Sequence, residues 1–185
     1  MELKKVIKER HSVRKFSLKT PDWRDIIECI DLSRYSPMAG NNFSLRFVLV
    51  QDKKKIKIIA DACQQDFVSQ VHAIVVFCTE PSRTKSAFGD RGEKYLRQQA
   101  GAAIENFVLG ITEKGLATCW VGHFEDDEIK EAIGAGPGVE IEAIFPIGYP
   151  AEKQYTKKIK MDLDLCLYFD QYKNKKMTKL EKLDV

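Results

Sequence analysis

The chain has 185 residues, enough for one domain with a sizeable core and too few for two ordinary domains. Apolar residues make up 44% of the sequence and charged residues 31%, which is typical of a folded globular protein and excludes a disordered chain. The net charge of +3 suits an anionic small-molecule ligand but is too small for an obligate nucleic-acid-binding protein.

The cysteines indicate a reducing environment. They are odd in number, widely scattered and without the spacing of metal ligands, and no secretory leader precedes them. The longest apolar run, residues 73–78, is too short to cross a bilayer. We therefore expect a cytoplasmic protein with no metal centre and no membrane span. The five cysteines are Cys29, Cys63, Cys78, Cys119 and Cys166.

A basic segment, residues 10–16, follows a short amphipathic helix that the apolar residues at positions 3, 6 and 7 predict. In an extended backbone, Arg10, Ser12 and Arg14 project to one side, because side chains alternate along a strand. Two guanidiniums flanking a hydroxyl make a good receptor for a phosphate dianion. The alternative is a solvated basic loop at the end of a helix.

The next helix is predicted to begin at Thr20-Pro21-Asp22, with the threonine hydroxyl as the cap and proline in the first turn. It should end before Ser36-Pro37, since the residue before a proline disfavours helix. The stripe expected to be buried consists of Trp23, Ile26, Ile27 and Ile30.

A loop of small residues, 36–42, comes next, with a proline, a glycine and two asparagines. Small residues let a flat ligand approach the backbone closely, whereas the simpler interpretation is a turn between a helix and a strand. After it we expect a strand at 46–50, a helix capped by Asp52, and a strand at 71–78. The charged segment 81–92 is interpreted as a mobile loop.

The longest predicted helix covers residues 93–114 and ends at Gly115. Between residues 100 and 111 it is apolar nearly all round, so it lies either at the centre of the core or in a subunit interface. The small residues at 100–103 permit close helix approach and favour an obligate dimer.

The remaining elements are a short strand at 116–122, a helix at 125–133 and an inner strand at 139–147. The glycine cluster at 134–138 follows a helix and precedes a strand, which is the wrong order for a phosphate-binding loop and excludes the Rossmann and P-loop classes. A basic patch at 157–160 and an apolar segment at 163–169 follow. The chain ends in a basic tail, residues 173–185.

Four of these segments together resemble the nitroreductase family of FMN-dependent oxidoreductases, in order and at plausible spacing over about residues 2–170. They are the Arg-x-Ser-x-Arg motif (Arg10, Ser12, Arg14), the loop 37–41 before a strand, the Ala-x-x-Asn run (Ala103, Asn106) ahead of Gly115-Leu116, and the segment 146–150 followed by a basic pair. Departures from the family pattern are Phe43-Ser44-Leu45 after the loop, Gln99 in place of an acid, and lysines where the last clamp usually has an arginine.

The resemblance implies an α+β fold, with a mainly antiparallel sheet flanked by helices, in a single domain over residues 1–185. It also implies an intertwined homodimer with two FMN sites at the interface. The FMN phosphate and ribityl chain would be held by Arg10, His11, Ser12 and Arg14, with Lys158 and Lys160 completing the clamp. The ring system would be lined by Pro37, Met38, Ala39 and Asn41 of the partner chain, and by Trp120, Val121, Gly122 and His123.

The expected function is transfer of electrons from NADH or NADPH through bound FMN to a flat conjugated acceptor, such as a nitroaromatic or a quinone. The flavin supplies the hydride chemistry, which agrees with the lack of a catalytic triad or carboxylate pair in the sequence. Two alternatives stay open. One keeps the fold but carries out reductive dehalogenation or flavin-ring cleavage, and the other is a non-catalytic basic module that binds nucleotides or RNA.

Overall fold

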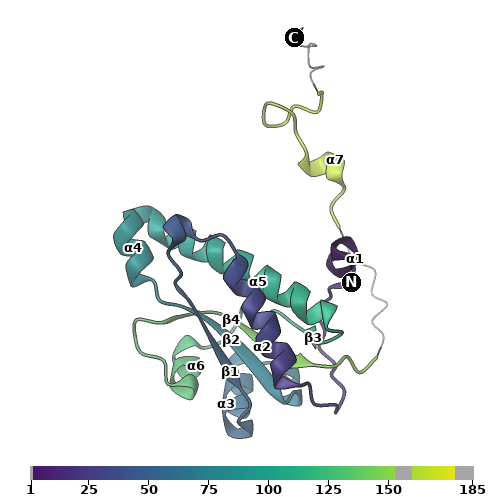
Figure 1. Ribbon diagram of the computed structural model, residues 1–185, viewed down its shortest axis with the longest axis vertical. Coiled ribbons are helices and arrows are strands. Elements are labelled where there is room, and N and C mark those ends of the chain that lie inside the picture. The colour runs from purple at the N-terminus through teal and green to yellow at the C-terminus, as the bar shows by residue number, and fades with distance from the viewer. Residues whose placement is uncertain (1, 153–159, 178–185) are drawn as a thin grey trace. The chain divides into compact units, whose positions relative to one another are not determined.

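The computed structural model describes residues 2–152 and 160–177 (Figure 1). The chain divides into two compact units, Met1–Gln154 and Tyr155–Val185. In the second unit, helix α7 (Leu163–Cys166) is capped by Asp162, and its leucines are exposed. The expectation that the whole chain forms one domain stays a prediction.

The first unit is built on a four-stranded sheet with strand order β1-β2-β4-β3. The strands are β1 (Leu45–Val50), β2 (Ala73–Thr79), β3 (Ala117–Thr118) and β4 (Glu140–Gly148). All pairs are antiparallel, with Phe47 opposite Phe77 and Val75 opposite Phe145. Helices flank this sheet, so the α+β class expected from the sequence is confirmed.

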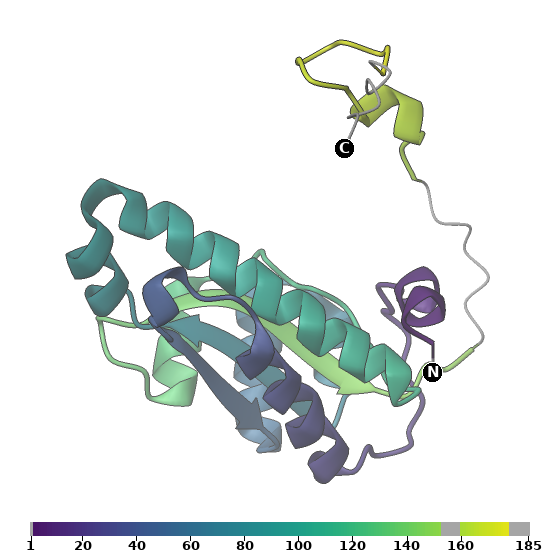
Figure 2. The same ribbon diagram turned by 45° about the horizontal axis from the view of Figure 1, so that its top comes forward.

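Strand β2 is buried along its whole length because helices cover both faces of the sheet. Its odd-numbered residues, such as Val75 and Phe77, pack against α2 (Trp23–Leu32) and α5 (Gly92–Glu113). The even-numbered ones, such as Val76, pack in the layer of α3 (Lys53–Cys63) and α6 (Asp126–Ile133). Figure 2 shows α2 and α5 side by side over the first face. An apolar run that does not alternate therefore forms an inner strand.

Phenylalanines form the centre of the α2–α5 layer. The Phe77 ring is fully buried, and its centroid lies 4.9 Å from that of Phe47, 5.1 Å from that of Phe107 and 5.2 Å from that of Phe145. Tilted and edge-on ring pairs of this kind add to the stabilisation that the buried area provides. The position of α5, which contacts the candidate site, is thus fixed by the core beneath it.

Most helix ends lie where local signals predict them. Helix α1 (Leu3–Glu9) forms as expected. The Asp52 carboxylate accepts hydrogen bonds from the amides of Lys54 and Lys55, at 2.8 and 3.1 Å, and so caps α3. Helix α6 ends at Gly134, whose φ of +71° places it in the left-handed region that favours glycine.

Helix α2 differs from its prediction in its cap and its buried face. The cap is Asp22, whose carboxylate accepts from the amide of Arg24 at 2.9 Å, rather than Thr20. Trp23 and Ile27 are 44% and 45% exposed, so placing them in the core was wrong. The sheet covers a narrower arc of the helix than the apolar stripe occupies.

The mobile loop expected at 81–92 is instead helix α4 (Ser82–Phe88) followed by the 3₁₀ turn Gly89–Arg91. Contacts distant in sequence stabilise it. A Cβ at Gly92 would lie 2.7 Å from the Lys85 Cα, so the missing side chain lets α4 pack closely on α5. The strand expected at 116–122 was also too long, since only β3 pairs regularly and Val121 adds an isolated bridge to Ile144.

Three further 3₁₀ turns, Ser33–Tyr35, Ala39–Asn41 and Asp66–Gln70, connect these elements. Among the residues described, no helix combines the length and hydropathy needed to cross a membrane. The same residues contain no group of three or more His, Cys, Asp or Glu side chains that could hold a metal ion.

Candidate functional site

The basic segment after α1 is extended and attached to the edge of the sheet. Val13 donates its amide hydrogen to the carbonyl of Thr118 at 2.9 Å, and Ser12 forms a parallel bridge with Thr118. Val13 is buried, whereas Ser12 and Arg14 on either side of it are exposed. Residues 12–14 therefore alternate between exposed and buried and pair with the sheet edge, but Lys15 is exposed like Arg14, so the alternation ends there.

This pairing creates a cavity of about 230 Å³ between the basic segment, α5 and the residues around β3. Four residues predicted to bind the cofactor meet there. Trp120 is 46% exposed, and its indole packs edge-on against Phe145 at 5.7 Å. The lining consists of Arg10, His11, Ser12, Glu105, Val108, Thr118 and Trp120.

The Thr118 hydroxyl is an unsatisfied polar group in this lining. Its Oγ1 is buried and has no hydrogen-bond partner within the described part of the chain. Burying a hydroxyl without a partner costs about 1–3 kcal/mol, so such groups usually have a role or a bound partner. An orphaned hydroxyl close to Arg10 and Ser12 fits a polar, anionic ligand such as the phosphate and ribityl portion of FMN.

The charges of both arginines affect the Cys119 thiol, although only Arg10 lines the cavity. Burial raises the pKa of the Cys119 thiol, and the charges of Arg14 and Arg10, with a hydrogen bond to Ser12, partly oppose that shift. Arg14 itself is outside the cavity lining, and its guanidinium carbon lies 5.9 Å from the centroid of the Phe67 ring. Cys119 remains a protonated thiol at neutral pH and is not a nucleophile.

The small-residue loop lies against a different part of α5. Pro37, Met38 and Ala39 line a second cavity of about 320 Å³. The rest of that lining is Tyr95, Gln98, Gln99 and Ala102, all from α5. Gly40 and Asn41 follow with φ of +55° each, a region that glycine and asparagine tolerate best.

The other predicted residues are placed less directly. Val121 is buried and pairs through its backbone with Ile144, whereas Gly122 and His123 are exposed and outside both linings. Lys158 lies outside the described residues, and Lys160 is an exposed residue of the second unit.

Sequence reasoning did not predict seven of the residues that line the two cavities: Thr118, Glu105 and Val108 in the first, and Tyr95, Gln98, Gln99 and Ala102 in the second. Gln99 carried a usable signal, because it lies on the apolar stripe of the long helix between Leu96 and Ala103, where a polar side chain is expected to be buried and hydrogen-bonded. Thr118 carried none, since its role depends on the pairing of two segments distant in sequence.

Comparisons with known proteins identify the family and the fold. A solved nitroreductase family protein from Clostridium novyi NT is 27% identical in sequence and superposes with a TM-score of 0.75. The match spans 94% of this chain and 96% of the Clostridium novyi chain. The NADPH:FMN oxidoreductase from Vibrio harveyi, solved in complex with NAD+, shares the fold at 17% identity, with a TM-score of 0.82 over 93% of this chain and 78% of its own.

A sequence relative, the iodotyrosine deiodinase of Thermotoga neapolitana, is 23% identical over 159 residues, which is 77% of this chain and 86% of the relative. The model of the nitroreductase family itself matches residues 7–70 and 58–149, from the basic segment to the end of β4. By this match over most of its length, the chain belongs to the nitroreductase family.

Proposed function

We propose that the protein is an FMN-dependent oxidoreductase that passes electrons from NADH or NADPH to a flat conjugated acceptor, such as a nitroaromatic or a quinone. The observation that carries this proposal is the cavity that Arg10, Ser12 and Trp120 line together with Thr118, whose hydroxyl has no hydrogen-bond partner among the described residues. Family membership and the structural likeness to the NADPH:FMN oxidoreductase from Vibrio harveyi support a flavin there.

In this proposal Arg10, His11, Ser12 and Arg14 hold the phosphate and ribityl chain, because charge-assisted bonds from arginine to phosphate are strong and geometrically specific. The segment from Trp120 to His123 is proposed to lie beside the ring system. FMN supplies the hydride and electron transfer when bound, so these residues need only bind and orient it.

We also propose that two copies of the chain complete each site. A cavity of about 230 Å³ is smaller than the roughly 300–1,000 Å³ typical of ligand sites, so one chain offers only part of the pocket. A Cβ placed on Gly101, at the middle of the outer face of α5, meets nothing within 4 Å. If two α5 helices pack antiparallel there, Glu105 of one copy lies opposite Gln98 of the other, which brings the two cavities together.

A titration of cofactor-free protein with FMN tests the site. The chain has two tryptophans, Trp23 and Trp120. Fluorescence quenching by FMN that is lost in the Trp120→Phe variant therefore comes from Trp120 and reports binding beside it. The Arg10→Ala/Arg14→Ala variant should bind FMN about a hundredfold or more weakly, since each removed cation loses a hydrogen bond to a charged group.

The control for this titration is Lys53→Ala/Lys54→Ala on α3, which removes the same charge from the opposite layer and should leave affinity unchanged. Equal affinity of the wild-type chain and the arginine variant would refute the phosphate assignment. Bleaching of the bound flavin by NADH or NADPH, followed by recovery with a nitroaromatic or a quinone, would establish the reductase activity.

Reductive dehalogenation is the second candidate, because a relative that covers 77% of the chain is an iodotyrosine deiodinase. The two activities separate in one experiment with pre-reduced enzyme. Release of iodide from iodotyrosine, without reoxidation by nitroaromatics or quinones, would replace the first proposal with this one.

The five cysteines are free, and four of them are buried. Burial raises the pKa of the Cys29, Cys63 and Cys78 thiols to about 12, so these groups stay protonated and unreactive. Free thiols in this number support our proposal of a reducing compartment, the cytoplasm.

A further inference from the structure

Gln99 is a buried polar side chain that connects α5 to the small-residue loop. It is 3% exposed, and both ends of its amide are hydrogen-bonded. Its Oε1 accepts from the backbone N–H of Ala39 at 3.2 Å, and its Nε2 donates to the hydroxyl of Ser44. Because the Ala39 group can only donate, the orientation of the Gln99 amide is fixed.

The loop is held to α5 at a second point, on the other side of Pro37 and Met38. Asn106, two turns along α5, donates from Nδ2 to the Ser36 hydroxyl at 2.9 Å. Pro37 and Met38 therefore lie between two residues that are hydrogen-bonded to the same helix. Each anchor satisfies buried polar groups, so displacing the loop would leave them unpaired.

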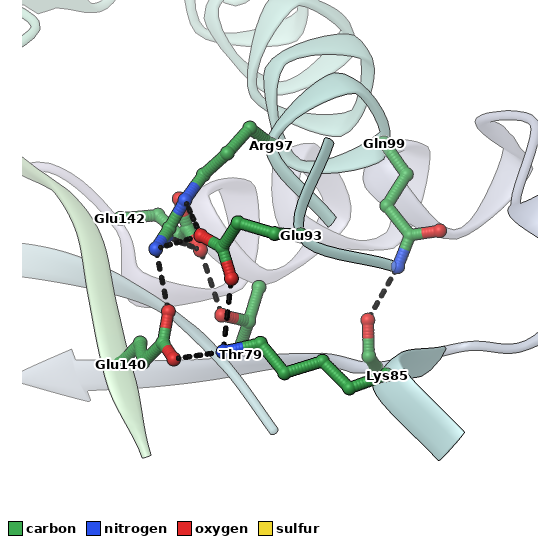
Figure 3. Close-up of polar contacts among 8 residues, drawn as sticks. Thr79, Lys85, Glu93, Arg97, Gln99, Glu140 and Glu142 are labelled. Atoms are coloured by element: carbon green, nitrogen blue, oxygen red, sulfur yellow. Dashed lines mark hydrogen bonds and ion pairs between the residues drawn. The ribbon is translucent and has the colours of Figure 1, made fainter. Parts of the chain in front are cut away.

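The part of α5 that carries Gln99 is itself fixed independently of the loop. Arg97 forms ion pairs with Glu142 and Glu140 of β4, each at 2.5 Å. Glu142 also accepts from the buried Thr79 hydroxyl at 2.7 Å. Figure 3 shows Arg97 reaching toward these carboxylates, while Gln99 extends away from them. The ion pairs with the sheet thus fix the position of α5, and the hydrogen bonds of Gln99 hold the loop to α5 at that position.

We propose, on the basis of the flavin site proposed above, that Gln99 is a positioning residue for the cofactor. Its two hydrogen bonds set the conformation of Pro37, Met38 and Ala39, which line the flavin ring. Gln99 does not need to touch the flavin, because its amide groups are already engaged by Ala39 and Ser44. Its loss acts through the loop, on the affinity and on the environment of the ring.

The test compares two substitutions at one position. Gln99→Leu keeps the approximate volume and removes both hydrogen bonds. Gln99→Glu keeps an acceptor for the Ala39 amide, and its carboxyl group can still pair with the Ser44 hydroxyl, which is able to donate. A third variant, Val68→Ala, serves as the control, because Val68 is fully buried in the α3–α6 layer and its truncation lowers stability without touching the loop.

Three readouts are measured on each variant: FMN affinity, the visible spectrum and reduction potential of the bound flavin, and amide hydrogen exchange of residues 37–42 without cofactor. Gln99→Leu should weaken FMN binding about tenfold or more, shift the spectrum or potential, and speed exchange in the loop. Gln99→Glu should restore affinity to within about threefold of the wild-type value. Val68→Ala should lower stability and leave all three readouts unchanged.

The positioning role is overturned if Gln99→Leu matches the wild-type chain in affinity and loop exchange. It is also overturned if Val68→Ala weakens FMN binding equally, because affinity then follows global stability. A wild-type chain that binds no FMN would refute the proposed function itself, and the positioning role with it. The wild-type titration therefore separates the two failures.

Discussion

Replacing Gly40 by alanine tests the geometry of the loop that is proposed to line the flavin. Gly40 has φ +55° and ψ +28°, a left-handed conformation that disfavours an L-residue by about 1–2 kcal/mol. The new Cβ would also lie 2.9 Å from Phe88 Cζ. The Phe88 ring is held edge-on by Tyr95, with centroids 5.1 Å apart, so it cannot turn away freely. We expect overpacking to add about 1 kcal/mol, for a total loss of about 2–3 kcal/mol.

The two contributions separate in a double-mutant cycle with Phe88→Leu, which shortens the side chain that meets the new methyl group. In that background Gly40→Ala should lose only the backbone part, about 1–2 kcal/mol. Urea unfolding followed by circular dichroism measures all four free energies. A loss below about 0.5 kcal/mol in the wild-type background would refute the left-handed assignment. Equal losses in both backgrounds would refute the steric contact.

Three other substitutions test the core, the charge cluster and the dimer. Phe77→Ala should lower the free energy of unfolding by about 3–5 kcal/mol in urea titrations, because it empties the centre of the phenylalanine cluster. The pKa of Glu93 is lowered, chiefly by a hydrogen bond from Lys85, so its ionised form stabilises the fold. Near pH 7 the Glu93→Gln variant should therefore be less stable than the wild-type chain, by about 0.5 kcal/mol because the ion pair is exposed. Thermal unfolding should show this difference vanish as the pH falls below 4.5, where the Glu93 carboxylate becomes protonated. Gly101→Arg should convert the proposed dimer into a folded monomer in light scattering, whereas Gly136→Arg, also in open space, should not.

Local signals were enough to predict much of the fold. The Asp52 cap, the glycine that ends α6 and the unbroken apolar run of β2 each depend on neighbouring residues alone. Helix α4 was missed because its stability comes from elsewhere in the chain. Lys85 reaches Glu140 of β4 at 3.1 Å, a contact that no local pattern contains.

The candidate site divides in the same way. The motif Arg10-x-Ser12-x-Arg14 could be read directly from the sequence, although in the structure only Arg10 and Ser12 of it line the cavity, and the Arg14 guanidinium lies over the Phe67 ring. Its neighbours could not be deduced from spacing alone, because the bridge from Ser12 to Thr118 is a matter of strand pairing. The resemblance supplied Trp120, and only the structure shows that Thr118, with a hydroxyl that lacks a partner in the described part of the chain, lines the same cavity.

The bridge between Ser12 and Thr118 has a consequence for the order in which the chain folds. The basic segment is synthesised about a hundred residues before its partner strand β3. Until then the segment has no edge to join, and closing so large a loop is slow compared with forming local helices. The proposed binding site is therefore complete only near the end of folding, and a cofactor captured there would stabilise only the finished molecule.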